Sequence, residues 1–335
     1  MKRFPWLILV SAIACMDSKE MKLQRFLLQG NDMAAKQNFQ DAKRYYSEAI
    51  RLDSCFADAW NNLGTLYYKE KHYGEALESY NQALACDTTN DQVLLYRSNT
   101  YYELNNYAEA LRDIDQYAAS NPDTITVHFS RGLIYTQMKQ FDLAIRSFRQ
   151  ALSRNEKNIE ILINIGTVYY YKREFDSARS MLDAALKIDP DEPNAFNTYA
   201  LIETELGNYD QGLRLINKAL SLKRNDAYFL NNRGYLYLMK NDLDLALADI
   251  DQSISEDPYN PWAYRNKGIY FFKKADYPSA KRLLERAENM DSSLEKLHLY
   301  LGQTYSELGD QSKACKSFSI SVDRKELREL PKLCR

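Results

Sequence analysis

The chain of 335 residues has little of what most non-helical folds and metal sites need. It contains only 11 glycines and 8 prolines, too few for the many turns of an all-β or α/β fold of this length. Its three histidines, His72, His128 and His298, lie far apart, and none of them has metal-ligand spacing with another. The hydrophobic content of 45% excludes a disordered chain. A helical protein is therefore expected.

An excess of charge of one sign is also missing. Lysine and arginine number 44, aspartate and glutamate 46, and the net charge is −2. A nucleic-acid-binding surface would need clustered excess positive charge. We therefore expect no nucleic-acid partner.

Catalytic motifs are absent from the sequence as well. It has no HExxH, no G-x-S-x-G, no P-loop and no G-x-G-x-x-G. No nucleophile stands in a pattern that would supply it with a base. We expect no enzyme activity, no metal and no small-molecule cofactor.

The N-terminus differs from the rest of the chain. A basic start is followed by an apolar run that is far shorter than the roughly 20 residues that span a bilayer. Small residues end the run, which is typical of a signal peptide over 1–14. "AIAC" resembles the lipobox of bacterial lipoproteins, although leucine usually stands where Ala12 is. This resemblance implies lipidation of Cys15 and a tether over 15–22; the alternative is ordinary cleavage after Ala14.

Export makes an oxidising compartment plausible for the other four cysteines, Cys55, Cys86, Cys315 and Cys334. Cys315 and Cys334 could close a loop near the C-terminus by a disulfide bond. Buried or free thiols are the alternative. The spacing contains no CxxC and so indicates neither a thioredoxin-like nor a zinc site.

Small residues recur every 34 residues. Steps from Gly64 reach Gly30, Ser98, Gly132, Gly166, Ala200, Gly234, Gly268 and Gly302. A second small-residue series follows 12 residues later: Ala42, Ala76, Ala110, Ala144, Ala178, Gly212, Ala246, Ala280 and Ala314. Such a period is the mark of a repeat architecture.

Each period contains two segments of about a dozen residues with helical periodicity. A short polar turn separates them, with Gly207, Gly309, Asn105 or Asn241 at one position, residues that tolerate left-handed backbone. We expect a helical hairpin in each repeat, with the two small residues bringing the helices together. One hairpin cannot bury both its faces, so the hairpins should stack into a solenoid.

The order W-x2-L-G-x2-Y…A-x3-Y-x2-A, complete from Trp60 to Ala83, resembles the tetratricopeptide repeat, or TPR. The resemblance implies an all-α, right-handed superhelical solenoid of nine TPR hairpins over 23–328. A C-terminal capping helix should close the array, and 329–335 should form a tail. Repeat 6 departs most from the pattern, with Ala200, Glu203 and Gly212 at its key positions.

The resemblance also implies that the first helix of each repeat lines a concave groove. Ligands should contact its second, fifth, sixth, ninth and twelfth positions. The expected partner-binding residues are Asn61, Asn62, Tyr68, Tyr102, Asn164, Tyr170, Asn197, Asn231, Asn232, Tyr235 and Asn266. Asparagine amides both donate and accept, which suits a peptide backbone, and aromatics are common interface anchors.

Two other features are interpreted as structural. Asp113, Asp115, Asp249 and Asp251 recur on second helices, where we expect solvated charge on the convex face. His128 and His298 fall on the position of Trp60 and should pack in the interior.

The carboxylate clamp of some TPR domains, built of lysine, asparagine and arginine, is incomplete here. Near the C-terminus Asn266 and Lys296 match it, but Asn231, Tyr235 and Tyr300 do not. We do not expect a carboxylate-clamp adaptor.

The sequence therefore predicts a non-catalytic protein-interaction scaffold, lipid-anchored in the bacterial cell envelope at the outer membrane. Its partner would be a protein or an extended peptide. The alternative is an envelope lipoprotein that binds a glycan or nutrient in an aromatic groove. An accessory factor for a secretion or motility machine is a narrower form of the first interpretation.

Overall fold

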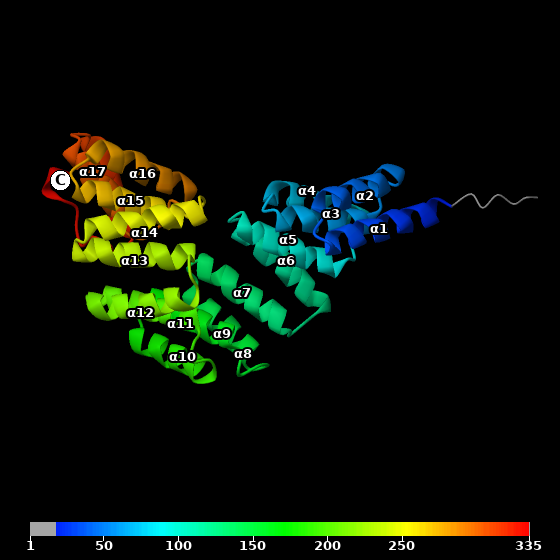
Figure 1. Ribbon diagram of the computed structural model, residues 1–335, viewed down its shortest axis with the longest axis horizontal. Helices are drawn as coiled ribbons and strands as arrows, with labels where there is room; N and C mark the ends of the chain where they lie inside the picture. Colours follow the sequence, from blue (N-terminus) through cyan, green and yellow to red (C-terminus); the bar gives the residue numbers. More distant parts are fainter. Residues whose placement is uncertain (1–17, 335) are drawn as a thin grey trace, which may run out of the picture. The chain divides into compact units, whose positions relative to one another are not determined.

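The computed structural model describes residues 18–334, and these residues form α-helices and no β-strand. The chain divides into two compact units, unit 1 (Met1–Arg154) and unit 2 (Asn155–Arg335). Within each unit, every helix packs against the next one, and several first helices of hairpins also contact one another, as α1 and α3 or α13 and α15 do. The predicted all-α fold of stacked hairpins is confirmed (Figure 1).

The described part of unit 1, residues 18–154, contains four helical hairpins. Its helices are α1 (Lys19–Ala35), α2 (Phe39–Leu52), α3 (Ala57–Lys69), α4 (Tyr73–Cys86), α5 (Asp91–Glu103), α6 (Tyr107–Ser120), α7 (Ile125–Gln137) and α8 (Phe141–Leu152).

Unit 2 contains five hairpins and a short 3₁₀-helix in its described part. Its helices are α9 (Ile159–Tyr171), α10 (Phe175–Ile188), α11 (Pro193–Glu205), α12 (Tyr209–Leu222), α13 (Ala227–Lys240), α14 (Leu243–Glu256), α15 (Pro261–Lys273), α16 (Tyr277–Met290), α17 (Leu297–Glu307), α18 (Gln311–Asp323) and η1 (Lys332–Cys334).

The turn inside every hairpin contains one residue in the left-handed region. These residues are Gln37, Lys71, Asn105, Lys139, Arg173, Gly207, Asn241, Ala275 and Gly309. The next residue then donates its N–H to a carbonyl five residues back, as His72 does to Tyr67 at 2.9 Å. The left-handed turn expected at the glycines and asparagines is confirmed, and it also forms where lysine, arginine, glutamine or alanine stands.

The contact at the repeated glycine differs in part from the expected one. A Cβ placed on Gly64 would lie 2.8 Å from the ring of Tyr80, so the glycine makes room for that side chain. In repeat 3 the two small residues do contact each other, because Ser98 Oγ donates to the carbonyl of Ala110 at 2.8 Å. The side chain four residues after each second small residue is buried throughout: Tyr46, Tyr80, Ile114, Phe148, Leu182, Ile216, Ile250, Leu284 and Phe318.

Repeat 6 keeps this packing by exchanging its two small residues. Ala200 stands where other repeats have glycine, and Gly212 stands where they have alanine, so a Cβ on Gly212 would meet the Ala200 carbonyl at 3.3 Å. Glu203 replaces an aromatic and is nevertheless buried. It accepts from Arg179 at 2.7 Å and from Asn208 at 2.8 Å, which compensates its charge.

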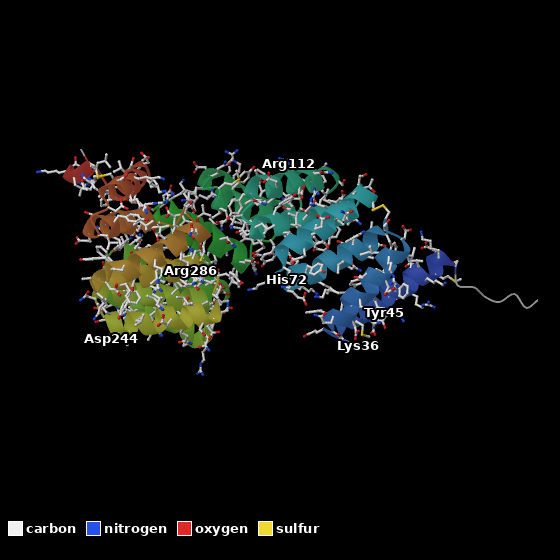
Figure 2. All side chains as sticks on the ribbon, turned by 90° about the horizontal axis from the view of Figure 1, so that it is seen from above. Lys36, Tyr45, His72, Arg112, Asp244 and Arg286 are labelled. Atoms are coloured by element: carbon white, nitrogen blue, oxygen red, sulfur yellow. A yellow bond between two sulfur atoms is a disulfide. The ribbon has the colours of Figure 1, made fainter. Side chains whose placement is uncertain are left out.

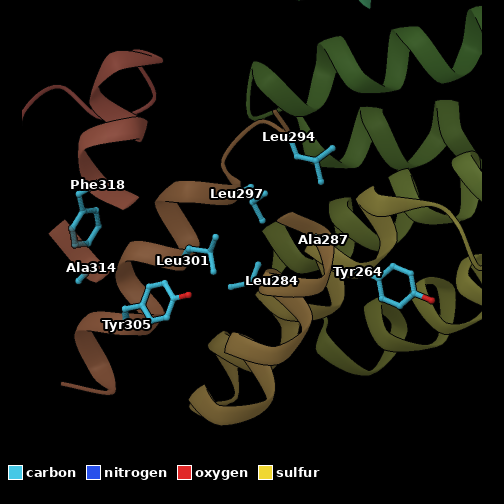
Figure 3. Close-up of a cluster of buried hydrophobic side chains, with 9 residues drawn as sticks. All are labelled: Tyr264, Leu284, Ala287, Leu294, Leu297, Leu301, Tyr305, Ala314 and Phe318. Atoms are coloured by element: carbon cyan, nitrogen blue, oxygen red, sulfur yellow. The ribbon is translucent and has the colours of Figure 1, made fainter. Parts of the chain in front are cut away.

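The last hairpin closes the array with an apolar cluster. Figure 3 shows Leu297 and Leu301 beside Leu284 and Ala287 of the preceding hairpin, with Phe318 on the far side of the cluster next to Ala314. Leu327, Leu330 and Cys334, from the segment after α18, pack against this cluster.

The expected C-terminal capping helix is only the single turn η1. Lys325 has a φ of 59°, which ends helical geometry after α18, and Pro331 has no N–H to donate within a helix.

Two disulfide bonds hold chain segments together, drawn as yellow bonds in Figure 2. Cys315 is joined to Cys334, and Cys55 is joined to Cys86, a pairing that the sequence analysis did not propose. The predicted signal peptide over 1–14 and the predicted lipidation site Cys15 lie outside the described residues. Over residues 18–334, no helix has the length and apolar character needed to cross a bilayer.

Candidate binding site

Unit 2 contains a pocket of about 790 Å³. Its walls come from α9, α11, α13 and α15, all first helices of hairpins, and from residues in the segments just before α11, α13 and α17. The lining residues of α9 are Ile159, Glu160, Ile163, Asn164, Thr167, Tyr170 and Tyr171, which include the second, fifth, sixth, ninth and twelfth positions of that repeat. The helical period of 3.6 places these positions on one face.

Six of the predicted groove residues line this pocket. They are Asn164, Tyr170, Asn197, Asn231, Asn232 and Tyr235. Asn266 does not line it and is fully buried behind it, and Asn231 is 3% exposed. Burial leaves these two amides almost no surface for a partner, so the surface available in this region comes from the other residues.

The asparagines bind one another across neighbouring repeats. Asn232 donates to the Oδ1 of Asn197 at 2.8 Å, and Asn266 donates to the Oδ1 of Asn231 at 2.8 Å. Each of these hydrogen bonds gives one amide donor and one amide acceptor a partner, as buried polar groups require. The ladder aligns successive first helices and shapes the pocket wall.

An ion cluster includes four residues that line the pocket, Glu205, Tyr235, Glu295 and Lys296. Lys296 donates to Glu205 at 3.1 Å and to the hydroxyl of Tyr235 at 3.2 Å. Arg173, from the turn after α9, donates to the other oxygen of Glu205 at 2.8 Å and lies 3.8 Å from Glu295. Residues from repeats 5, 6, 7 and 9 therefore meet at this point.

Arg265 lines the pocket and is 6% exposed. Its guanidinium donates to the Oδ1 of Asn266 at 2.7 Å and to the backbone carbonyl of Glu295 at 2.8 Å. It also lies 4.7 Å from the ring centre of Trp262 and 5.3 Å from that of Tyr235. Burial lowers the pKa of Arg265, and the two rings and two oxygens are its local compensation.

The cluster shifts the pKa values of its members. Burial alone would raise the pKa of Glu205, but the charges and hydrogen bonds of Lys296 and Arg173 outweigh it and lower that pKa. Burial would lower the pKa of Lys296, yet Tyr235 and Glu205 raise it. Burial, with Glu205 and Glu295 nearby, raises the pKa of Tyr170 well above its usual range. At neutral pH, Glu205 and Lys296 are therefore both charged.

An irregular start of repeat 9 brings Glu295 and Lys296 to the pocket. Its first helix, α17, begins at Leu297, whereas the equivalent helices α9, α11, α13 and α15 begin at the first residue of their repeats. Lys296 has a φ of 59°, and its backbone N–H donates to Glu326 at 2.8 Å. The turn at 295–296 thus places Glu295 and Lys296 against the pocket.

Sequence reasoning named none of Arg173, Glu205, Arg265 or Glu295 as site residues. Arg265 and Lys296 stand at the fifth and second positions of repeats 8 and 9, so the groove positions could have identified them. Glu205 lies 91 residues from Lys296. No periodic pattern relates them.

The inner side of unit 1 is different. Tyr68 and Tyr102 line a hollow of about 150 Å³ together with Ser98, Glu103 and Ser130. Asn61 and Asn62 do not line it. Asn62 donates to the Oδ1 of Asn31 at 2.9 Å, and Tyr46 donates to the same oxygen at 2.8 Å. Asn31 and Asn62 of unit 1 therefore bind one another as the unit 2 asparagines do, and Asn62 does not line the hollow.

The expectation of solvated charge at Asp113 and Asp249 is wrong. Both are buried, and each accepts two hydrogen bonds from an arginine of the preceding helix, Arg97 at 2.7 and 2.8 Å and Arg233 at 2.6 and 2.8 Å. The carboxylates lie between the two helices of a hairpin, where a charge requires such a partner.

Their neighbours Asp115 and Asp251 are about half exposed, and each pairs with a base of the next repeat. Charged side chains that lie on the outside, such as Lys36, Arg112, Asp244 and Arg286, are labelled in Figure 2.

The histidine interpretation is confirmed. His128 and His298 are 6% and 2% exposed. His128 lies 2.8 Å from Asp123, and His298 lies 3.0 Å from the carbonyl of Ser292. Within residues 18–334, no group of three histidine, cysteine or acidic side chains is placed to hold a metal ion.

The sequence matches several models of one family, each described as tetratricopeptide repeat. One model matches residues 57–90, a second matches 97–159, and a third matches 135–202 and 172–234. Together the matches cover 57–90 and 97–234, half of the chain. No curated protein sequence matches the chain.

Solved structures share the fold at low sequence identity. A chain in the crystal structure of the APC/C hetero-tetramer Cut9-Hcn1 is 16% identical, with a TM-score of 0.58 over 92% of this chain and 61% of that one. A tetratricopeptide repeat protein from Parabacteroides merdae is 24% identical, with a TM-score of 0.47 over 84% of this chain and 98% of that one. YrrB, described as a TPR protein with an unusual peptide-binding site, is 24% identical, with a TM-score of 0.47 over 51% of this chain and 88% of its own.

The stacked hairpins, the 34-residue period and these family matches agree, and the chain belongs to the tetratricopeptide-repeat family.

Proposed function

We propose that the protein is a non-catalytic interaction scaffold that binds an extended segment of a protein partner in the pocket of unit 2. The observation that carries this proposal is the pocket itself, whose walls are first helices of consecutive repeats. Stacked helical repeats typically use such concave surfaces to bind partners.

The composition of the pocket suits a polypeptide. Asn164, Asn194 and Asn197 offer amides with donors and acceptors for backbone groups. Tyr171 and Tyr228 are 44% and 52% exposed, so their rings can bury area against a partner. The volume of about 790 Å³ is within the range of ligand-binding clefts and holds a few side chains.

We further propose that the protein is exported and held to the outer membrane of a bacterial envelope by lipid on Cys15. The disulfides Cys55–Cys86 and Cys315–Cys334 support an oxidising compartment, in which such bonds persist. Mass spectrometry of the mature N-terminus tests the anchor. A diacylated or triacylated Cys15 supports it, whereas an intact Met1 or an unmodified N-terminus contradicts it.

The binding proposal is tested by crosslinking the full chain to proteins of its native envelope. We expect a crosslinked partner whose yield falls severalfold in Tyr228→Ala and in Asn164→Ala. Gln92→Ala is the matched control, because Gln92 is the exposed residue at the position of Tyr228 four repeats earlier. A partner lost equally in the control, or no protein partner together with binding on a glycan array, would contradict the proposal.

A further inference from the structure

Negatively charged side chains outnumber positively charged ones in the unit 2 pocket, and more of them are left for a ligand. Five carboxylate side chains and three basic ones line it. The carboxylates are those of Glu160, Glu192, Glu205, Asp226 and Glu295, and the bases are Lys223, Arg265 and Lys296. The pocket therefore has an excess of negative charge, although the whole chain is nearly neutral.

The three bases are already bound within the protein. Lys296 is held by Glu205 and Tyr235, and Lys223 lies 2.7 Å from Asp226. Arg265 is buried, and its guanidinium is held by Asn266 and by the carbonyl of Glu295. A ligand carboxylate would have to displace these contacts.

Two carboxylates remain without a basic partner among the described residues. Glu160 is exposed at the second position of repeat 5, and the Asn164 side chain donates to its backbone carbonyl rather than to its carboxylate. Glu192 precedes α11, and its Oε1 accepts only from the backbone and side-chain nitrogens of Asn194, at 2.9 and 2.8 Å. The charge left for a ligand is therefore negative.

Two exposed aromatic rings also line the pocket. Tyr228 lies at the second position of repeat 7, as Glu160 does in repeat 5, whereas Tyr171 lies at the other end of α9 from Glu160. A ring face attracts an ammonium or guanidinium group, and the hydroxyl can accept from it. Carboxylates and aromatic rings together favour a cation over an anion.

From these observations we infer that the partner segment carries a lysine or arginine, whose cationic side chain binds at Glu160 and Glu192 in this pocket. The inference rests on the proposed function and adds the chemistry of the partner: a basic, extended peptide. An acidic peptide would meet the unpaired carboxylates and be repelled.

Selection of random dodecapeptides on the full chain tests the inference without a known partner. We expect the selected peptides to be enriched in lysine and arginine over aspartate and glutamate by at least about threefold, because the unpaired charge is negative. A selected peptide should bind the double variant Glu160→Gln/Glu192→Gln about tenfold more weakly, and replacing its basic residue by glutamine should have a similar effect.

Matched variants separate this charge effect from folding. Glu256→Gln removes an exposed carboxylate of unit 2 outside the pocket and should change affinity by less than about twofold. Glu160→Gln alone leaves the Glu192 contact at the start of α11 intact and should still weaken binding. Raising NaCl from about 0.05 M to about 0.5 M should weaken binding to the unmodified chain more than to the double variant.

Two failures can be distinguished. Selected peptides that need Tyr228 but show no basic bias, or that bind the double variant equally well, overturn the inference and leave the proposed function standing. If no selected peptide loses binding in Tyr228→Ala, the proposed function fails and the inference fails with it.

Discussion

An ion pair between an arginine and a buried aspartate occurs at equivalent positions in the two units. In unit 1, Arg97 binds Asp113 and the Oδ1 of Asn81. In unit 2, Arg233 binds Asp249 and the Oδ1 of Asn217 in the same way, and each of these residues stands four repeats after its counterpart. The hairpin framework is thus common to the two units, including its polar details.

The inner surfaces of the two units are not alike. The unit 1 hollow has a volume of about 150 Å³, whereas the unit 2 pocket has a volume of about 790 Å³. Only unit 2 joins a glutamate and a lysine three repeats apart in the described structure, through Glu205 and Lys296. The repeated positions build the framework, and residues that break the repeat build the candidate site.

Truncation of the shared core should have the largest effect, and a similar one in both units. Phe148→Ala in unit 1 and Leu182→Ala in unit 2 remove fully buried side chains at the same repeat position. Each should lower the free energy of unfolding by about 3–5 kcal/mol, through lost burial and a cavity. Amide hydrogen exchange resolves the loss by unit.

Leu245→Ala, which truncates a side chain that is 54% exposed, is the control and should cost under about 0.5 kcal/mol. A large loss in only one unit would mean that the frameworks are not equivalent.

Removal of the buried carboxylates should have the next largest effect. Asp113→Ala and Asp249→Ala leave Arg97 and Arg233 without their main partner. Because these arginine side chains are 20% and 25% exposed, we expect a loss of about 2–3 kcal/mol in each unit, below the full cost of an unpaired buried charge.

The half-exposed neighbours Asp115 and Asp251 provide controls on the same helices, and their alanine variants should cost under about 1 kcal/mol. Equal losses at buried and half-exposed positions, measured by denaturant unfolding, would contradict this assignment.

Much of this framework is predictable from the sequence because it is local or periodic. The glycine at 64 and the alanine at 76 define two helix faces, and the turn position keeps its left-handed backbone even at Lys71 or Ala275, where the residue type does not demand it. The burial of Asp113 is less predictable, because its position in the helical pattern also suits an exposed face. Arg97, which stands 16 residues earlier, donates two hydrogen bonds to it and compensates its buried charge.

The candidate site is predictable only in part. Asn164 and Tyr228 occupy groove positions that the repeat register identifies. The contact between Glu205 and Lys296 depends on how four consecutive hairpins stack and on the irregular turn before α17. Neither is encoded in a local pattern.

The smallest stability effect should come from the ion cluster, and only in unit 2. Lys296→Ala removes one partner of Glu205 and should cost about 1 kcal/mol at pH 7. The pKa of Glu205 is lowered from its ordinary value of 4.5, so the stability that it contributes is present above that value and is lost as the pH falls through the lowered pKa.

Lys296→Ala should therefore reduce the acid sensitivity of unit 2 and leave that of unit 1 unchanged. Thermal unfolding, monitored by hydrogen exchange at pH 7 and at about pH 3.5, measures the loss of stability and its pH dependence in each unit. Identical pH dependence in the variant and the unmodified chain would mean that the cluster does not stabilise the fold.

The most direct test of the comparison is site-specific photocrosslinking in the native host. A benzoylphenylalanine replaces either Tyr228 in unit 2 or Gln92, its counterpart four repeats earlier in unit 1. Both residues are exposed at the second position of their repeats. We expect a defined protein adduct from position 228 and none from position 92. An adduct from position 92 with none from position 228 would contradict the claim that unit 2 holds the binding site.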